Sequence, residues 1–447
     1  MQLPVAFAQQ MRLQLGTDFD AFVAALLDAP PVSIHYHPQK QKNRKENIGG
    51  VKWNSDGVYL SERPVFTLDP AFQAGAYYVQ EASSMFVKEA FRQSFPEAGT
   101  MNVLDLCAAP GGKSTLLAST IPEGSVLLSN EVIRNRYRTL RYNMVKWGQG
   151  NTHLSQHDSR EFQDLSGFFD LVLVDAPCSG EGLFRKDPKA QGEWSPEHVQ
   201  HCSARQRRIL SEAVQLVKPG GFLFYCTCTY NDVENQANAQ WMEKEFDLTY
   251  FPLKHPEEWN LVEKDRGLQL YPHRVKGEGF YLVCFRKNGI APKLKIPGQP
   301  ALSPLPRKQK EQLNPWIKEM DTLEFGLDKQ GNIRAWLKEQ QSAISQLAGT
   351  LRRFQAGFEV GTFKGKDFIP APELALHTSL NKSIPSVEVD RMTALKFLKK
   401  EALELPGLPK GWTLIKYEGL GLGWVKVLPN RINNYYPKGW RILMEIT

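Results

Sequence analysis

The segment Leu104-Asp-Leu-Cys-Ala-Ala-Pro-Gly-Gly-Lys113 runs from apolar residues into small ones and two glycines, and a helical pattern follows it. Small residues let the backbone approach a ligand closely at the carboxyl edge of a sheet, next to the N-terminus of a helix. The segment therefore predicts a strand, a ligand-binding loop and a helix, in that order.

Apolar segments recur on both sides of this loop. They lie at 101–106, 125–128, 171–174 and 221–225, and helical patterns separate them. Such alternation predicts an α/β fold in which a doubly wound parallel sheet has helices on both faces. A further apolar segment, 279–285, is expected to form a late edge strand.

The glycine spacing of the loop distinguishes three possible cofactors. A nucleotide phosphate loop requires a glycine five positions before Gly112, where this chain has Cys107. A dinucleotide loop requires three spaced glycines, and only Gly111 and Gly112 are present. S-adenosylmethionine has no phosphate, so a loop of small residues without the complete phosphate pattern suits it. We therefore expect S-adenosylmethionine as the cofactor.

Two acidic residues follow the next predicted strands. Glu131 lies 19 positions after Gly112, where a carboxylate can accept hydrogen bonds from ribose hydroxyls. Asp158 follows the next stretch and could accept from an adenine amino group. Either residue alone would be interpreted as a surface carboxylate, but their placement after successive strands favours a joint role in cofactor binding.

Cysteines stand at the ends of two predicted strands. The fourth strand ends in Asp175-Ala-Pro-Cys178, and the fifth ends in Cys226-Thr-Cys228. Because strand ends in an open α/β sheet meet in one crevice, we expect Cys178 and Cys228 to converge beside the loop. Enzymes that methylate exocyclic amines tend to carry Asp/Asn-Pro-Pro-aromatic at the fourth strand, so a thiol there argues against an amine-directed enzyme.

A thiol in this position indicates methylation of carbon 5 of cytosine, a poor nucleophile. A thiolate that adds to carbon 6 raises the electron density on carbon 5, and covalent catalysis of this kind divides one difficult step into easier ones. A free thiol has a pKa of about 8.5, so the nucleophile requires a positive environment, for which Lys113 and Arg185 are candidates. Asp175 is expected to hold the N3/N4 edge of the cytosine.

Several stretches of the chain match one known family. They are Tyr78-Val-Gln-Glu-Ala-Ser-Ser-Met85, Ala108-Ala-Pro-Gly-Gly-Lys113, Asp175-Ala-Pro-Cys-Ser-Gly-Glu-Gly182, Arg185-Lys-Asp-Pro188, Trp194-Ser-Pro196, Pro219-Gly-Gly221, Thr227-Cys-Thr229 and Glu234-Asn235. At these positions the sequence resembles the RsmF-type bacterial ribosomal RNA cytosine-5 methyltransferases of the wider NOL/NOP/Sun family. It departs from them at Cys226, where serine is usual, and at Glu278, where aspartate is expected.

The resemblance implies a class I methyltransferase with a Rossmann-like sheet, in which Cys228 is the nucleophile and Cys178 assists product release. Cofactor contacts are implied for Cys107, Ala108, Ala109, Pro110, Gly111, Gly112, Lys113, Glu131, Asp158 and Asp175. The implied substrate is a cytosine of small-subunit ribosomal RNA, with transfer RNA as the runner-up. The rival interpretation is a non-catalytic RNA-binding assembly factor, and the two placed thiols argue against it.

The length and pattern of the chain predict several units. We expect an N-terminal α/β extension at 1–98, the catalytic domain at 99–288, a Pro- and Lys-rich linker at 289–315, a small intermediate domain at 316–375 and a β-rich module at 376–447. Phe19 to Leu27 is expected to be helical. Leu420-Gly-Leu-Gly-Trp424 and Tyr436-Pro-Lys438 resemble the PUA-like RNA-binding module of the RsmF branch.

The charge distribution also favours RNA as the partner. The net charge is +7, and residues 391–447 hold ten Lys/Arg against four Asp/Glu. A basic terminal unit of this kind suggests a polyanion. We expect RNA contacts from Arg185, Lys186, Lys438 and Arg441. Tyr435, Tyr436 and Trp440 could equally stack on RNA or belong to the core of the module.

The sequence also argues against other classes. It contains no apolar run of about 18 residues, as a membrane span requires, and the start of the chain does not resemble a signal peptide, so we expect a cytoplasmic protein. The six cysteines are expected to be thiols rather than disulfides. Cys226-x-Cys228 has no second pair at finger spacing, so we expect no metal. A monomer is the default expectation.

Overall fold

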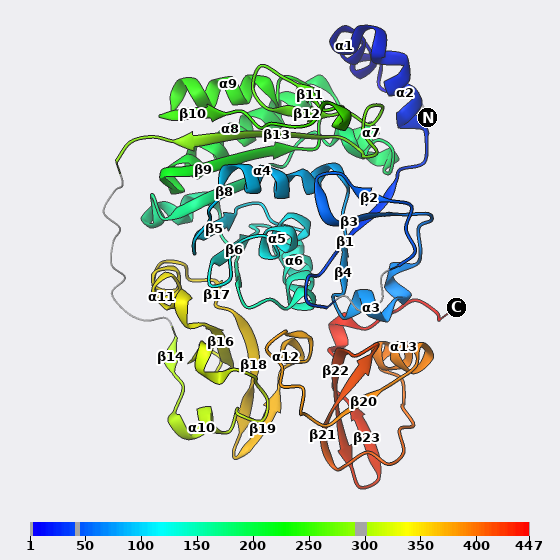
Figure 1. The fold of residues 1–447 in the computed structure, drawn as a ribbon, viewed down its shortest axis with the longest axis vertical. Coiled ribbons are helices and arrows are strands. Elements are labelled where there is room, and N and C mark those ends of the chain that lie inside the picture. Colours follow the sequence, from blue (N-terminus) through cyan, green and yellow to red (C-terminus); the bar gives the residue numbers. More distant parts are fainter. Residues whose placement is uncertain (1–2, 41–44, 291–301, 447) are drawn as a thin grey trace.

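The computed structural model describes residues 3–40, 45–290 and 302–446, and its centre is a ten-stranded sheet (Figure 1). The strands of this central sheet are β5 (Asn102–Asp105), β6 (Val126–Asn130), β7 (Thr152–Ser155), β8 (Phe169–Asp175), β9 (Val217–Thr227), β10 (Leu248–Phe251), β11 (Val262–Glu263), β12 (Leu268–Leu270), β13 (Phe280–Lys287) and β17 (Phe354–Gln355). Their order is β11-β12-β13-β9-β8-β5-β6-β7-β17, and β10 pairs with β13. The middle of this order, from β9 to β7, is parallel throughout.

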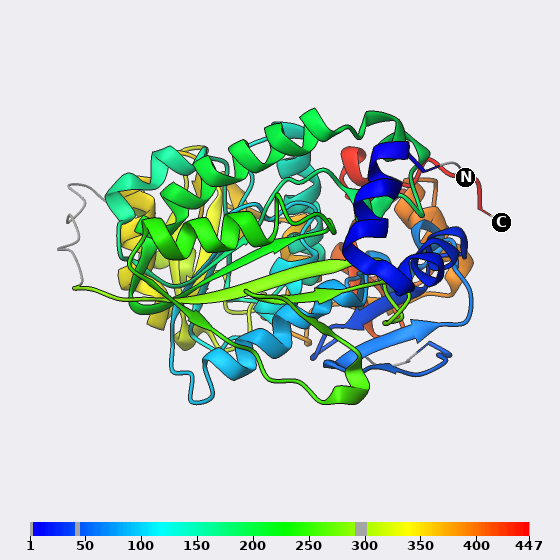
Figure 2. The same ribbon diagram turned by 90° about the horizontal axis from the view of Figure 1, so that it is seen from above.

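Helices cover both faces of the central sheet, which confirms the expected α/β class (Figure 2). They are α4 (Phe86–Ser94), α5 (Gly112–Ala118), α6 (Arg134–Trp147), α8 (Pro196–Leu216) and α9 (Gln236–Glu245), whereas the short helix α7 (Pro188–Glu193) packs in a cluster with residues of the N-terminal helices. Apolar side chains of α4 and α5 belong to the core on one face, and those of α8 and α9 belong to the core on the other. The polar ends of the parallel strands are left free at one edge, where a ligand can bind.

The expectation that 279–285 forms an edge strand is wrong. β13 pairs antiparallel with β9 on one side, and both β12 and β10 pair with its other side. The physical reason is burial, since the first six residues of β13 are all buried. An uncovered apolar strand would expose a long unpaired edge to solvent, and the short strands β10 and β12 cover it.

The N-terminal extension consists of two helices, a short third helix and a small sheet. The helices are α1 (Val5–Leu15) and α2 (Phe19–Leu27), and the second confirms the predicted bounds. The sheet has the order β2-β3-β1-β4, formed by β1 (Val32–Tyr36), β2 (Gly50–Val51), β3 (Asn54–Leu60) and β4 (Tyr77–Val79), with the short helix α3 (Pro70–Gln73) before β4. The extension thus brings β4 to the start of α4 and to the central sheet.

A second small sheet, the intermediate sheet, follows the central one in sequence. Its strands are β14 (Ser303–Pro304), β15 (Leu323–Leu327), β16 (Ile333–Leu337), β18 (Phe358–Lys364) and β19 (Asp367–Pro370), and its helices are α10 (Arg307–Glu311), α11 (Gln341–Thr350) and α12 (Pro372–Leu376). Of the expected linker, 291–301 lies outside the described residues. From Ser303 onward the linker expectation is wrong, because β14 pairs with β15 and joins this sheet.

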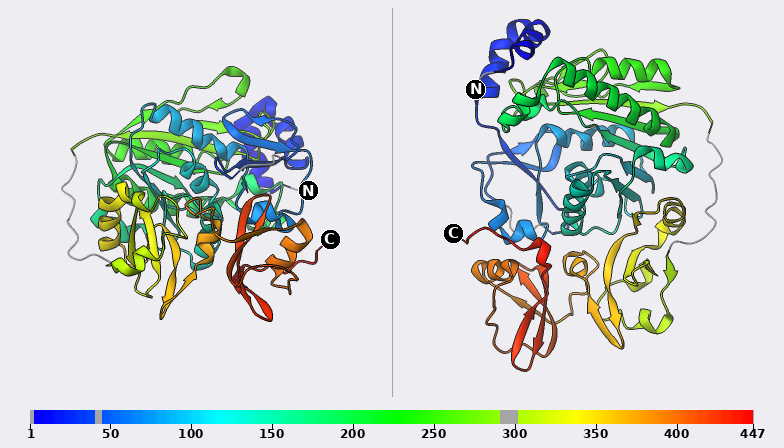
Figure 3. Two further views of the ribbon diagram at one scale, coloured as in Figure 1. Left: turned by 60° about the horizontal axis from the view of Figure 1, so that its bottom comes forward. Right: turned by 180° about the vertical axis from the view of Figure 1, so that it is seen from behind.

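The C-terminal module is β-rich, as predicted. Its sheet consists of β20 (Ser386–Glu388), β21 (Gly411–Tyr417), β22 (Leu420–Leu428) and β23 (Arg431–Asn434), and α13 (Arg391–Lys399) packs against it. The two C-terminal sheets lie side by side below the central sheet (Figure 3). Trp440 packs on Tyr142 of α6 with ring centroids 5.2 Å apart, so the module contacts the central domain. None of the helices in the described ranges has the length and apolar character that crossing a bilayer requires.

Candidate active site

The loop between β5 and α5 has a backbone that glycine alone suits. Gly111 has φ of 117°, in the left-handed region that disfavours side chains, and it caps the N-terminus of α5. At Gly112 an added Cβ would lie 3.3 Å from Tyr78 and 3.4 Å from Gln80, both of the N-terminal extension. The small residues predicted to approach a ligand therefore also allow the extension to pack close to the loop.

Glu131 lies directly after β6 and is buried. One of its carboxylate oxygens, Oε1, accepts a hydrogen bond from the Ile133 N–H at 2.9 Å. The other, Oε2, has no hydrogen-bond partner among the described residues, although Arg136 Nη1 is 3.5 Å away. A buried carboxylate oxygen without a hydrogen bond is a costly arrangement that a bound hydroxyl group would relieve.

Asp158 lies after β7, as expected, but its carboxylate is already engaged. It accepts from the Arg160 N–H at 3.2 Å and pairs with the Arg208 guanidinium at the same distance. Burial raises the pKa of Asp158, but these hydrogen bonds lower it by more, so the carboxylate is ionised at neutral pH. A role in adenine binding would require one of its oxygens to be shared.

Asp105 is a buried acid of the site that the sequence analysis did not single out. It ends β5, directly below the loop, and burial is the main cause that raises its pKa to about 7. Ser114 donates a hydrogen bond to Oδ2 at 2.6 Å, whereas Oδ1 has no partner among the described residues. Its place at the end of the predicted strand, just before the small residues, is the sequence feature that could have identified it as a residue of the site.

The structure brings Cys178 and Cys228 together at the carboxyl edge of the sheet. Their Sγ atoms are 3.2 Å apart, although the residues come from the loops after β8 and β9. The hydrogen bond to Cys228, followed by burial, raises the pKa of the Cys178 thiol well above its usual value. Cys178 therefore keeps its proton at neutral pH, and either sulfur can be the donor of the hydrogen bond between the two thiols.

A lysine supplies positive charge beside the thiols. Lys113 Nζ donates to Asp175 Oδ2 at 2.8 Å, and both side chains are mostly buried. Burial lowers the pKa of Lys113, but the Asp175 carboxylate and the sulfurs of Cys226 and Cys228 raise it by more. The ammonium group is therefore charged at neutral pH and favours a thiolate nearby.

Two fully buried carboxylates join the loops that carry the thiols. Glu234, from the segment after Cys228, accepts from the Ser179 N–H at 3.0 Å and from Gln206 Nε2 at 2.6 Å. Glu181, from the Cys178 loop, accepts from the Tyr230 N–H at 2.7 Å and from Asn231 Nδ2 at 2.9 Å. Each loop thus holds the backbone of the other through a buried carboxyl group. Both acids stand in matched motifs, but their sequence context alone predicted no role for them.

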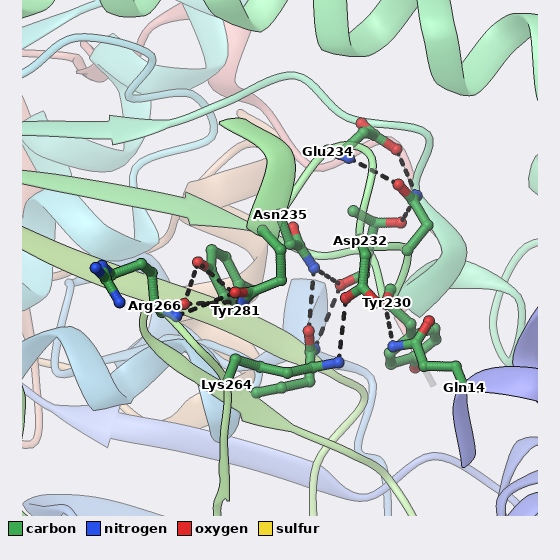
Figure 4. Close-up of polar contacts among 12 residues, drawn as sticks. Gln14, Tyr230, Asp232, Glu234, Asn235, Lys264, Arg266 and Tyr281 are labelled. Carbon is green, nitrogen blue, oxygen red and sulfur yellow. Dashed lines mark hydrogen bonds and ion pairs between the residues drawn. The ribbon is translucent and has the colours of Figure 1, made fainter. Parts of the chain in front are cut away.

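The segment after Cys228 is also tied to its wider surroundings (Figure 4). Gln14 of α1 donates to the Tyr230 carbonyl at 2.8 Å, and Lys264 pairs with Asp232 at 3.1 Å. Asn235 Nδ2 donates to the carbonyl of residue 229 at 3.1 Å. Contacts with α1 and with Lys264, together with one within the segment, therefore hold the backbone that follows the thiol.

Backbone contact between the two loops depends on Gly182. Its N–H donates to the Cys228 carbonyl at 2.8 Å, and an added Cβ would lie only 2.7 Å from that oxygen. No side chain fits there without moving one of the loops. In the Gly-Glu-Gly sequence that follows Cys178, Glu181 is therefore needed for its hydrogen bonds and Gly182 for its lack of a side chain.

The expected RNA contacts lie in three different settings. Arg185 donates to the carbonyls of Asp28, Ala29 and Gly277, so it joins the Cys178 loop to the extension. Lys186 pairs with the buried Glu278 at 2.5 Å. Lys438 and Arg441 are exposed in the C-terminal module. Their roles stay predictions.

The aromatic residues of the C-terminal module divide between core and surface. Tyr436 is buried, and its ring is 5.4 Å from that of Phe397, so it belongs to the core. Trp440 is partly buried at the contact with Tyr142. Tyr435 is 39% exposed and packs edge-on against Trp412. Of the three, Tyr435 is the most available for stacking.

The remaining cysteines do not converge on the site in the same way. Cys202, Cys226 and Cys284 are buried, and burial is the first cause that raises the pKa of each thiol. Cys107 is partly buried in the cofactor loop. In the part of the chain that the structure describes, no group of three or more His, Cys, Asp or Glu side chains is arranged to hold a metal ion.

Three sequence models of protein families match the chain in succession. Residues 3–82 match the N-terminal domain of 16S rRNA methyltransferase RsmF, 95–286 match 16S rRNA methyltransferase RsmB/F, and 384–442 match the methyltransferase RsmF PUA domain. The chain belongs to the RsmF family of ribosomal RNA methyltransferases. The RsmF matches to the N-terminal extension and the C-terminal module agree with the small sheets seen at those places.

Relatives of RsmF type match along nearly the whole length. Ribosomal RNA small subunit methyltransferase F of Escherichia coli O139:H28 is 27% identical over 97% of this chain and 96% of its own. That of Aliivibrio salmonicida is 28% identical over 98% and 97%. The similarity to these RsmF proteins therefore extends over nearly the full length of both chains.

Solved structures match the fold over about two thirds of the chain. A methyltransferase homologue from Pyrococcus horikoshii is 28% identical with a TM-score of 0.55, covering 63% of this chain and 94% of its own. NSun6 from the same organism, solved with SFG, has a TM-score of 0.54 at 18% identity, covering 64% and 98%, which shows the fold alone.

Proposed function

We propose that this RsmF-family chain transfers the methyl group of S-adenosylmethionine to carbon 5 of a cytosine in small-subunit ribosomal RNA, through a covalent bond between Cys228 and carbon 6. The observation that carries the proposal is the pair of thiols 3.2 Å apart, next to the ion pair of Lys113 and Asp175. An enzyme that methylates an exocyclic amine has no use for two thiols at this place.

The loop and its neighbours fit S-adenosylmethionine, which supplies an electrophilic methyl group when it is bound. The backbone of 107–113 lies at the N-terminus of α5, where unpaired N–H groups favour a carboxylate. Glu131 Oε2 has no hydrogen-bond partner among the described residues and would accept from the ribose. Asp158 would have to share its carboxylate between Arg208 and the adenine amino group.

Cys228 performs the covalent steps. Its thiolate adds to carbon 6, and the electron pair of the 5,6 double bond moves toward carbon 5 and the N3 side of the ring. Carbon 5 would then be nucleophilic enough to accept the methyl group that bound S-adenosylmethionine would supply, and the sulfonium sulfur would keep the electron pair of the broken bond. Loss of the carbon 5 proton to a base restores the double bond, expels the sulfur from carbon 6 and returns its electron pair to Cys228.

The neighbours of Cys228 assist at different stages. The charged Lys113 ammonium and the Cys178 S–H both stabilise the thiolate before attack and again at its departure. Asp175 uses one oxygen for Lys113, and the other has no partner among the described residues. That oxygen would accept from the N4 amino group and so select cytosine over uracil.

The test is nucleoside analysis after incubation with methyl-labelled S-adenosylmethionine. Small-subunit ribosomal RNA, assembled small subunits and transfer RNA are the three substrates. Wild type should produce 5-methylcytidine in a ribosomal substrate, Cys228→Ala should produce none, and the matched control Cys202→Ala should behave as wild type. A label on another atom, or activity in Cys228→Ala, would contradict the proposed chemistry, whereas preference for transfer RNA would contradict the substrate.

A further inference from the structure

A cleft of about 830 Å³ lies outside the active site, between α6, β17 and the intermediate sheet. Figure 1 shows α6 and β17 at the border between the central sheet and the strands β16 and β18. Five cations line this cleft, namely Arg141, Lys329, Arg334, Arg352 and Arg353, against the two carboxylates of Asp328 and Glu359. The α6 cleft, as we name this set, therefore has an excess of positive charge.

The two carboxylates are already engaged. Asp328 accepts hydrogen bonds from backbone and side-chain N–H groups of residues 330–332. Glu359 lies 3.7 Å from both Arg141 and Arg334, which pair with Glu373 as well. Glu359, together with Glu373, thus pairs with Arg141 and Arg334, and the other three cations have no carboxylate from the cleft.

The other cations are exposed. Arg353 pairs with Glu161 at 2.9 Å, outside the α6 cleft. Lys329 and Arg352 have no carboxylate within ion-pair distance in the described ranges, and both side chains are exposed. Exposed cations without partners at the mouth of a cleft can neutralise an anion at little desolvation cost.

Helix α6 extends this charge toward the cofactor loop. Arg134, Tyr137, Arg138 and Arg141 stand three and four positions apart, so they share one face of the helix. Tyr137 and Arg141 line the α6 cleft, while Arg134 and Arg138 are exposed on the same face. Neither of the two exposed arginines pairs with a carboxylate of a described residue.

The α6 cleft lies at the same edge of the sheet as the thiols. Phe354 of β17 pairs with Ser155 at the end of β7, and the Gln156 N–H donates to the Arg353 carbonyl. β17 is five strand positions from β9, which at about 4.8 Å per strand is roughly 24 Å. This span is too long for one phosphate group and suits several consecutive nucleotides.

We propose that the α6 cleft binds the single-stranded RNA that flanks the target cytosine, an inference that rests on the proposed function. Arg134, Arg138 and Arg352 hold successive phosphates, and the rings of Tyr137 and Phe354, which line the cleft, offer surfaces on which bases stack. Contact with unpaired flanking nucleotides helps to keep the target base accessible, since a base in a duplex hides carbon 6.

The test compares three variants in binding to a labelled single-stranded RNA of mixed sequence over a range of salt concentrations. The first variant carries Arg134→Ala, Arg138→Ala and Arg352→Ala. The charge-matched control carries Arg63→Ala, Lys244→Ala and Lys308→Ala, which are exposed positions outside the cleft. The third restores the charge, with lysine at the same three positions. Thermal unfolding and S-adenosylmethionine binding are measured for each.

Loss of three phosphate contacts should reduce the slope of log Kd against log salt by about 2, and weaken binding about 100-fold at 0.1 M salt. The control should change affinity less than twofold, and the lysine variant should recover most of the loss. Equal affinity and slope in the alanine variant and the control would overturn the inference. So would an alanine variant that binds RNA normally but fails on assembled subunits, since a protein partner would then occupy the cleft.

The same variants separate this inference from the proposed function. The alanine variant should keep the wild-type kcat on a short oligonucleotide at saturation, because none of its three residues touches the thiols. If the alanine variant makes 5-methylcytidine and its RNA affinity is unchanged, the inference about the α6 cleft is overturned and the proposed function is not. Absence of 5-methylcytidine in wild type would instead overturn the proposed function, whatever the affinities are.

Discussion

Replacement of Gly182 by alanine should separate the two thiols with the smallest possible chemical change. The added Cβ would lie 2.7 Å from the Cys228 carbonyl oxygen, whereas non-bonded heavy atoms prefer at least about 3.5 Å. One loop must therefore move by roughly 0.8 Å, which also weakens the 2.8 Å hydrogen bond from the Gly182 N–H. Overpacking costs about 1–3 kcal/mol, and the weakened hydrogen bond adds about 1 kcal/mol.

The effect on the reaction should exceed the effect on stability. Because a displacement of about 1 Å at reacting groups costs on the order of 100-fold in rate, kcat should fall by about that factor while S-adenosylmethionine binding is unchanged. Single-turnover methylation and thermal unfolding measure the two effects. Gly192→Ala is the matched control, since its Cβ meets nothing within 4 Å. Wild-type kcat in Gly182→Ala would refute the claim that the close approach of the loops sets the thiol geometry.

Three further predictions concern the surroundings of the site. Glu234→Gln places an amide against buried hydrogen-bond donors, so the free energy of unfolding measured in urea should fall by about 1–3 kcal/mol. The exposed control Glu245→Gln should leave this free energy unchanged, and equal stability of the two variants would exclude the proposed network. Asp105 has its pKa raised by burial to about 7, so the fold holds its proton more tightly than the unfolded chain and loses stability as pH rises from about 4 to 7. Asp105→Asn should flatten this loss in urea titrations of the apo protein at several pH values, and an unchanged slope would reject the assignment. Trp440→Ala should lower the unfolding temperature because the ring packs on α6, whereas weaker RNA binding at an unchanged temperature would favour stacking on RNA.

The centre of the fold could be predicted because its signals are local. The apolar segments that became β5, β6, β8 and β9 are separated by helical patterns, and parallel strands bring their carboxyl ends together. That rule alone predicted that Cys178 and Cys228 converge. It needed no knowledge of side-chain packing, because the ends of neighbouring strands are one strand spacing apart.

The rest depends on contacts between distant residues. β17 and β14 have two residues each, too few for a periodic pattern, and they exist because β7 and β15 offer unpaired edges. β13 became an interior strand because β10 and β12 pair with the edge that β9 leaves free. Glu181 and Glu234 look like surface acids in the sequence, since a buried carboxylate is recognisable only once its donors are in place.

Trapping of the covalent bond between protein and RNA tests the central claim most directly. Wild type, Cys178→Ala and Cys228→Ala would be incubated with S-adenosylmethionine and small-subunit ribosomal RNA, and adducts that resist denaturation would be counted on gels. The account predicts an accumulated adduct in Cys178→Ala, which lacks the thiol that assists departure, and none in Cys228→Ala. An adduct in Cys228→Ala, or 5-methylcytidine made without any adduct in Cys178→Ala, would contradict it.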